Sequence, residues 1–178
     1  MSAHVEPILA TVLDTPAGAL SLLARGDTLV AAGFTGDPSQ MYARLHPSVA
    51  TGPLAAVPPE DLPWLVKPVR GYFDGDLAAL DSLPVYQAGT PLRQRLWQQM
   101  RAIPAGRTLT YTQLAAELGM PPGAARVAGA ACAANLIAPM VPCHRVLRTD
   151  GSLGGYYYGL PCKAWLLAHE GATVSPPH

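Results

Sequence analysis

Cysteine, charge and long apolar runs are all scarce in this sequence of 178 residues. The three cysteines, an odd number, lie in the last third of the chain and form no Cys-x-x-Cys pair. This pattern argues against a disulfide framework and predicts a reducing, cytoplasmic location. No apolar run reaches the roughly 20 residues of a membrane span, and residues 1–12 lack the basic start of a signal peptide. We therefore expect no membrane association.

Charged residues make up only 13% of the chain and hydrophobic residues 49%, which predicts a folded protein with a substantial core. The net charge of zero hides an asymmetry between the two halves. Residues 1–85 carry four basic and nine acidic groups, whereas residues 86–178 carry eight basic and three acidic ones. The basic half favours a polyanionic partner, and the alternative is chance combined with an acidic half that aids solubility.

The first half of the chain has the pattern of a scaffold built on strands. Apolar runs separated by turn residues predict three strands, at residues 8–13, 19–24 and 28–34. Residues 40–46 and 66–73 predict two short helices, and the prolines from 47 to 68 exclude a regular sheet interior there. No metal-ligand or nucleotide-loop spacing occurs in this half. We interpret residues 1–85 as a scaffold domain.

The second half, residues 86–178, has mainly helical patterns. Thr90 and Pro91 form a cap and first turn, and apolar residues then recur at helical spacing as far as Ile103. Residues 110–118 and 124–134 predict two more short helices, joined by a glycine-containing turn as in a helix-turn-helix. The last of these carries small residues and one long cation, Arg126. It either packs tightly in a core or lies against a nucleic-acid groove that Arg126 enters.

Candidate chemistry concentrates at Cys143 and His144, between prolines and apolar residues on a strand or turn. A lone buried cysteine is usually inert, and neighbouring strand residues point to opposite faces. A thiolate nucleophile needs a proton acceptor, so His144 can serve only if the backbone turns or a water bridges the gap. The histidine in turn needs a carboxylate to fix its tautomer. Glu170, at the end of a helix predicted over residues 161–169, is the best candidate in this half.

The segment Pro142-Cys143-His144-Arg145-Val146 resembles the active-site motif of the O6-alkylguanine-DNA alkyltransferases, which repair O6-methylguanine in DNA. The resemblance extends over essentially the whole chain, through segments at residues 15–18, 72–76, 89–92, 103–106, 110–115 and 165–171. It implies an α/β (α+β) fold. The N-terminal domain would be a ribonuclease-H-like sheet with helices, and the C-terminal domain a mostly helical, winged-helix-like domain with a helix-turn-helix.

The resemblance also implies the activity and the roles of single residues. The activity is the irreversible, stoichiometric transfer of an alkyl group from O6-alkylguanine to the protein, with O4-alkylthymine as a further candidate substrate. Cys143 matches the alkyl acceptor, His144 the base reached through a water, and Glu170 the carboxylate that orients the histidine. Asn135 matches the residue that ties the helix-turn-helix to the active-site segment. Tyr111 matches the phenol that donates a proton to the leaving guanine.

The implied partner is duplex DNA, bound through the minor groove with the alkylated guanine flipped out, and Arg126 matches the side chain that fills the gap. The implied DNA-facing surface also includes Ala125, Gly129 and Thr110. The implied substrate pocket consists of Val146, Tyr156, Tyr157 and Cys132. Because no cysteine precedes Cys132, we expect no zinc site of the kind found in some relatives. We expect no cofactor and no obligate protein partner, and therefore a monomer.

Four features depart from the family pattern, and one is the helix-turn-helix loop at residues 121–123, which is one residue longer than in some relatives. Leu136 follows Asn135 where the family commonly has proline, which would loosen that turn. The loop of Tyr156, Tyr157 and Tyr158 is bulkier than in some relatives and puts large adducts such as benzyl in doubt. Cys132 stands where some relatives have a methionine that lines the pocket.

Three other functions remain open at this stage. An alkyltransferase-like protein would bind lesions without repairing them, but such relatives replace the cysteine that this chain retains. A Cys-His hydrolase would need an oxyanion hole and would turn over an ester. A DNA-binding regulator would bind specific duplex sequences and would have no use for the Pro-Cys-His-Arg motif.

Overall fold

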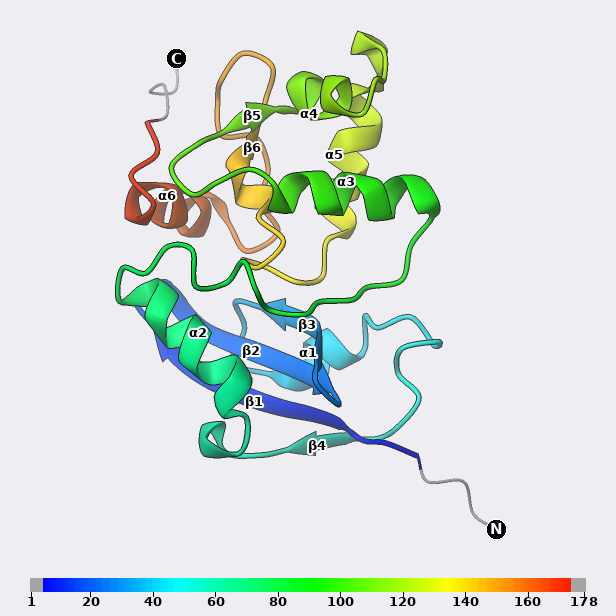
Figure 1. Ribbon diagram of the computed structural model, residues 1–178, viewed down its shortest axis with the longest axis vertical. Helices are drawn as coiled ribbons and strands as arrows, with labels where there is room; N and C mark the ends of the chain where they lie inside the picture. The colour runs from blue at the N-terminus through cyan, green and yellow to red at the C-terminus, as the bar shows by residue number, and fades with distance from the viewer. Residues whose placement is uncertain (1–4, 174–178) are drawn as a thin grey trace. The chain divides into compact units, whose positions relative to one another are not determined.

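The computed structural model describes residues 5–173 and divides the chain into two units (Figure 1). The first unit contains the chain up to Ala88 together with Leu136–Met140, and the second contains Gly89–Asn135 and the chain from Val141 onward. The domain boundary after residue 85 stays a prediction. Among the described residues, no helix is long and apolar enough to cross a membrane.

A four-stranded sheet forms the centre of the first unit, with strand order β3-β2-β1-β4. The strands are β1 (Ile8–Thr15), β2 (Gly18–Arg25), β3 (Thr28–Gly33) and β4 (Leu54–Ala56). The first three form antiparallel hairpins at the predicted positions, and Gly26 occupies the left-handed conformation that the tight β2–β3 turn requires. The short edge strand β4 pairs parallel to β1 within the proline-rich stretch.

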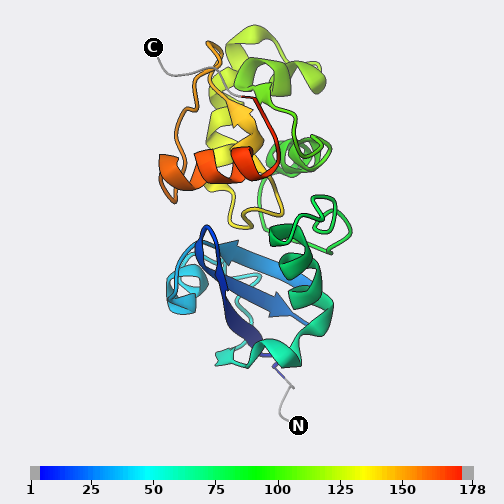
Figure 2. The same cartoon turned by 90° about the vertical axis from the view of Figure 1, so that its left-hand side faces the viewer.

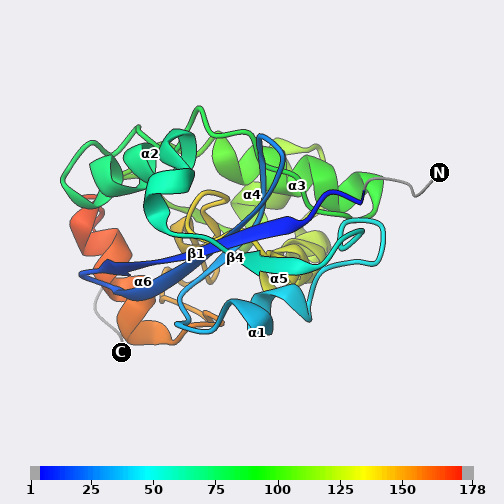
Figure 3. The same ribbon diagram turned by 90° about the horizontal axis from the view of Figure 1, so that it is seen from below.

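Helices α1 (Pro38–Tyr42) and α2 (Pro63–Phe73) cover opposite faces of this sheet (Figures 2 and 3). The 3₁₀ turn η1 (Pro59–Asp61) precedes α2. Alternating side chains of the strands pack with α1 in a core of Ile8, Ala10, Leu23, Val30, Ala31, Met41, Leu45, Val49 and Leu136. Helix α2 begins three residues before its predicted start, because Pro63 fits the first turn of a helix, where no N–H bond is lost.

The outer edge of β3 is covered by two segments from later in the sequence. Leu29 donates to Pro84 O at 2.9 Å and accepts from the N–H of Tyr86 at 3.0 Å. Ala32 donates to Leu136 O at 2.9 Å and accepts from the N–H of Ala138 at 3.0 Å. The segment Leu136–Met140, which leads directly to Cys143, is therefore held by backbone hydrogen bonds to the sheet.

The second unit is mainly helical (Figure 1). Its elements are α3 (Pro91–Arg101), β5 (Leu109–Thr110), α4 (Tyr111–Glu117), η2 (Pro122–Ala124), α5 (Ala125–Ala134), η3 (Cys143–Arg145), β6 (Val146–Leu147) and α6 (Leu160–His169). The predicted helix-turn-helix is present as α4 and α5, joined through η2. Trp97 on α3 donates to Ala131 O on α5 at 2.9 Å, which fixes the spacing of those helices. Strands β5 and β6 pair in parallel, and β6 follows directly after the turn that begins at Cys143.

Gly52 should tolerate no side chain, because the chain from Glu6 passes directly over it. A Cβ at this position would lie 2.0 Å from the backbone oxygen of Glu6, whereas at Gly36 it would lie 3.7 Å from Ala19 Cβ. We expect Gly52→Ala to lower the free energy of unfolding in urea by about 1–3 kcal/mol, the usual cost of overpacking. The matched variant Gly36→Ala should leave it nearly unchanged, and equal effects of the two variants would contradict this packing.

Candidate active site

A single 3₁₀ turn, η3, carries Cys143, His144 and Arg145, and all three are buried. The turn is closed by the N–H of Cys143, which donates to Val141 O at 2.8 Å, and by the N–H of Arg145, which donates to Pro142 O at 2.9 Å. Adjacent residues of a turn do not alternate between opposite faces as strand residues do. The backbone therefore turns at this point, and the action of His144 on Cys143 stays a prediction.

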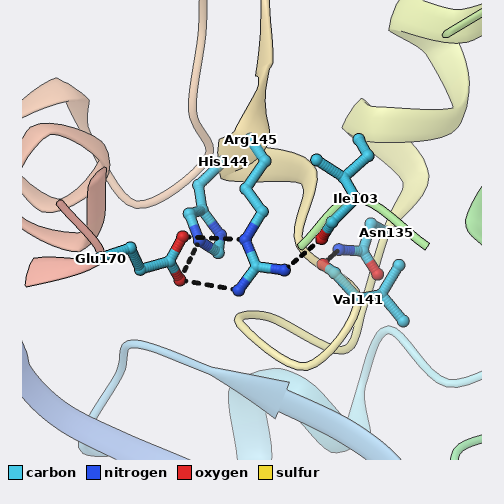
Figure 4. Close-up of polar contacts among 6 residues, drawn as sticks. All are labelled: Ile103, Asn135, Val141, His144, Arg145 and Glu170. Carbon is cyan, nitrogen blue, oxygen red and sulfur yellow. Dashed lines mark hydrogen bonds and ion pairs between the residues drawn. The ribbon is translucent and has the colours of Figure 1, made fainter. Parts of the chain in front are cut away.

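His144, Arg145 and Glu170 form one buried network (Figure 4). His144 Nε2 lies 2.9 Å from Glu170 Oε2. Arg145 donates to the same carboxylate twice, from Nε to Oε1 at 2.8 Å and from Nη2 to Oε2 at 2.9 Å. Its Nη1 donates to Ile103 O at 2.6 Å. The guanidinium thus binds the carboxylate through two hydrogen bonds, one to each oxygen, which is the strongest geometry for such a pair.

Burial and hydrogen bonding set the protonation states of this network. Burial would raise the pKa of Glu170, but hydrogen bonds from His144 and Arg145 outweigh it and hold the carboxyl's pKa well below its usual range. Burial lowers the pKa of His144, although Glu170 opposes this shift. A neutral imidazole beside a carboxylate carries its proton on the nitrogen facing that carboxylate, here Nε2. Nδ1, which has no hydrogen-bond partner among the described residues, is left as a proton acceptor.

Asn135 connects the end of α5 to the cysteine. Its Nδ2 donates to Val141 O at 2.8 Å and to Cys143 Sγ at 3.3 Å. Burial raises the pKa of the Cys143 thiol, and the Asn135 hydrogen bond opposes this by stabilising the thiolate. Leu136, which stands where the resemblance led us to expect proline, donates its N–H to Gln87 Oε1 at 2.9 Å, a bond that proline is unable to form.

Tyr111 and Cys132 lie in the electrostatic surroundings of Cys143. Burial raises the pKa of Tyr111 to about 12, and both thiols add to the shift. The phenol therefore stays protonated at neutral pH and can donate a proton. A Cβ at Gly154 would lie 3.3 Å from Tyr111 Oη and 3.2 Å from Arg148 Cγ, so the loop after β6 passes close to the phenol. Cys132, on α5, is partly buried, and burial raises its pKa well above the ordinary value.

The other predicted pocket residues lie on β6 and the following loop. Val146 is fully buried. Tyr156 and Tyr157 each make an edge-to-face contact with Tyr158, at centroid distances of 5.7 and 4.9 Å. Tyr157 is nevertheless 68% exposed. The role of these tyrosines in a pocket stays a prediction.

The predicted DNA-facing residues lie on the helix-turn-helix. Arg126 is exposed on α5, and Ala125 and Gly129 on the same helix are half-buried. A Cβ at Gly129 would meet no atom within 4 Å, so this position borders open space. Thr110 has a structural use as well, because it caps α4 in a reciprocal capping box with Gln113. Within residues 5–173, no group of three histidine, cysteine or acidic side chains is placed to hold a metal ion.

Comparison with known proteins gives the family. The family model of the 6-O-methylguanine DNA methyltransferase DNA-binding domain matches residues 91–172. A mouse methylated-DNA–protein-cysteine methyltransferase is 36% identical over 179 residues, which cover 94% of this chain and 83% of the mouse protein. The chain belongs to the methylated-DNA–protein-cysteine methyltransferase family. This confirms the resemblance identified from the Pro142–Val146 motif.

One further relative and one solved structure extend the comparison. A Salmonella typhimurium methylated-DNA–protein-cysteine methyltransferase is 53% identical over 100 residues, which are 56% of this chain and 58% of that relative's length. The solved structure of Mycobacterium tuberculosis OGT in complex with DNA is 31% identical, with a TM-score of 0.75 over 92% of this chain and 93% of that one. The mixed α/β fold class is confirmed by this likeness.

Two buried residues near the candidate site were not predicted from the sequence. Arg145 belongs to the recognised motif, yet nothing in its spacing shows that its guanidinium is buried against Glu170. Lys163 is completely buried in α6. The available signal was its position as a single lysine within an otherwise mostly apolar helix.

Proposed function

We propose that this protein repairs alkylated DNA by transferring the alkyl group from O6 of guanine to Sγ of its own Cys143. The observation that carries the proposal is the buried turn on which Cys143, with Asn135 at its sulfur, adjoins the His144–Glu170 pair. The family supports the reaction class, and the DNA-binding domain model and the DNA complex of the Mycobacterium tuberculosis relative support duplex DNA as the partner.

In the proposed mechanism, His144 activates the cysteine. Nδ1 takes the thiol proton of Cys143 through an intervening water, while Glu170 stabilises the imidazolium that results. This step requires a neutral His144 and an ionised Glu170 before the reaction. The lowered pKa of His144 and the lowered pKa of Glu170 agree with both requirements. The His–Glu pair thus acts as a general base and its orienting group.

The thiolate then attacks the alkyl carbon in line with the C–O6 bond. The S–C bond forms as the C–O bond breaks, and the electron pair of that bond passes to the purine. Tyr111, protonated because of its raised pKa, donates a proton to the guanine ring so that it leaves as a neutral base. The proton held by His144 restores the phenol through solvent, so the thiol proton is transferred overall to guanine.

The product is a thioether on Cys143, which is stable to hydrolysis under these conditions. Each protein molecule therefore reacts once. Because O6 of guanine lies within the base stack, the nucleotide must be extruded before attack. We propose that α5 enters the minor groove, where its small side chains permit close approach, and that a monomer suffices.

Intact and peptide mass spectrometry after incubation with a duplex containing one O6-methylguanine tests this function. We expect a single methyl gain on the peptide containing Cys143, saturating at one per protein molecule. Lesion binding without methyl gain would instead identify a lesion-binding protein. Turnover of an ester would indicate a hydrolase. A parallel duplex with O4-methylthymine tests the second candidate substrate.

Arg126→Ala should slow methyl transfer from duplex DNA by about 10- to 100-fold, because filling the gap in the stack offsets a few kcal/mol of unstacking. Methyl transfer from the free base O6-methylguanine should be unchanged. Arg70→Ala, an exposed position on α2 with the same change in charge, is the matched control. Single-turnover rates of methyl transfer from the duplex and from the free base, at two salt concentrations, measure the effect of each substitution. Equal slowing of Arg126→Ala with duplex and free base would contradict the role of Arg126.

A further inference from the structure

Lys163 is a completely buried lysine that the proposed mechanism does not use. Its Nζ donates to Val146 O at 2.8 Å and to Gly155 O at 3.3 Å, and also to Leu153 O. These three carbonyls belong to β6 and the loop that follows it. One amine therefore joins α6 to β6, which carries Val146, and to the loop that leads to Tyr156 and Tyr157 of the predicted substrate pocket.

The geometry of these bonds fixes the charge of Lys163. Three carbonyl acceptors require three N–H donors, and only the ammonium form supplies three. A buried charge is strongly unfavourable unless an opposite charge lies near it. The buried carboxylate of Glu170 pairs with His144 and Arg145, and within residues 5–173 Lys163 makes no ion pair. The ammonium thus lacks a carboxylate partner in the described part of the chain.

Cys143 and Cys132 are the groups whose ionisation would balance this cation. Helix α6 packs against η3, which carries Cys143, while Cys132 comes from α5. Burial lowers the pKa of Lys163, and the two thiols oppose this shift, with Cys143 the stronger and Arg148 acting against them. Tyr111, on α4, faces the same two thiols and stays protonated. Cys143 accepts a hydrogen bond from Asn135, which favours its ionised form, so we take it as the thiol that ionises.

We propose that Lys163 is the built-in counter-cation of the Cys143 thiolate, held in place by the three carbonyls. It is a positioning residue that acts through the cysteine and the loop. The inference rests on the proposed function only in taking Cys143 as the reacting group. In the ionisation step the Cys143 S–H bond breaks and its proton goes to His144, while Lys163 keeps all three of its protons. Methylation replaces the thiolate by a neutral thioether and leaves the ammonium without its partner.

The first test measures the rate at which iodoacetamide alkylates Cys143 as a function of pH, by peptide mass spectrometry and without DNA. Removing the cation in Lys163→Met, or in Lys163→Gln, which retains N–H donors, should raise the midpoint of the profile by about one pH unit or more. One unit corresponds to a tenfold smaller thiolate fraction at lower pH, or about 1.4 kcal/mol. Lys67→Met, which removes the other lysine of the chain, is the matched control and should leave the midpoint unchanged.

The second test observes Lys163 itself and keeps the cation in place. With only two lysines in the sequence, ¹⁵N-labelled side chains give one Nζ signal each for Lys67 and Lys163. Because coupling between two titrating groups is reciprocal, Cys143→Ser should lower the Lys163 midpoint by the same number of pH units. Equal Lys163 midpoints in the two folded proteins would overturn the proposal. If the wild-type protein transfers no methyl group from DNA although both pH shifts are present, the proposed function is refuted and the coupling between Lys163 and Cys143 still stands.

Discussion

Cys143→Ala is expected to abolish methyl transfer from O6-methylguanine completely while leaving the binding of the lesion duplex intact. In the proposed reaction Sγ of Cys143 receives the methyl group, and Asn135 donates a hydrogen bond to this sulfur that favours its ionised form. Cys143→Ser should be inactive as well, because an alcohol in this buried turn does not ionise near neutral pH. Mass spectrometry measures the methyl gain of each variant, and fluorescence anisotropy measures its binding to the lesion duplex.

Cys162→Ala is the matched control for this loss. Cys162 is half-buried on α6, and burial raises its pKa to about 11, so its thiol stays protonated and unreactive. This variant should accept one methyl group per molecule at the wild-type rate. A methyl group found on Cys132 of the Cys143→Ala protein would contradict the assignment of a single acceptor.

Glu170→Gln is expected to cause the largest loss of stability among single substitutions at the site. It removes the anion that Arg145 and His144 share, and leaves the buried guanidinium uncompensated. Breaking a buried pair from one side typically lowers the free energy of unfolding by about 3–5 kcal/mol. Methyl transfer should slow by at least about 100-fold, because the imidazole loses the group that orients it. Urea unfolding and single-turnover kinetics measure the two effects.

The double variant Arg145→Met/Glu170→Gln separates the pair from its surroundings. Removing the cation as well should restore part of the lost stability, so the double variant should be more stable than the sum of the single losses predicts. Additive losses would show that Arg145 and Glu170 do not interact in the folded protein. Methyl transfer should remain slow in the double variant, since His144 still lacks its carboxylate.

The same pair predicts how stability depends on pH. The pKa of Glu170 is depressed in the folded protein, so its contribution is present above the ordinary glutamate pKa of about 4.3. It is lost as the pH falls below that value toward the folded pKa, because the unfolded chain binds the proton first. Wild-type protein should therefore lose more stability between about pH 5 and pH 2 than Glu170→Gln does. Parallel curves for the two proteins would contradict the depressed pKa.

Local patterns predicted the elements of this fold well, and the motif predicted its family. The Thr90-Pro91 and Thr110 caps begin α3 and α4 as expected, because capping depends on residues close in sequence. Cys143 and His144 were predicted from the motif, and Glu170 was predicted as the best-placed carboxylate of the second half. The structure places Glu170 beside His144, and the catalytic roles of all three stay a prediction. Arg145 and Lys163 escaped prediction because their burial depends on residues far away in sequence, such as Ile103 for Arg145. The pairing of Leu136–Met140 with β3 has the same origin, since no local pattern encodes an edge contact.

That pairing makes the first unit discontinuous in sequence. A fragment ending at Ala88 would lack Leu136–Met140, and Ala32 of β3 would then have neither of its edge hydrogen bonds. A fragment beginning at Gly89 would carry the same five residues without the strand that they pair with. Limited proteolysis or gene splitting at residue 88 should therefore yield two pieces that recover a folded structure by associating, in the manner of fragment complementation. Evolutionary exchange of either unit as a separate module is hindered for the same reason.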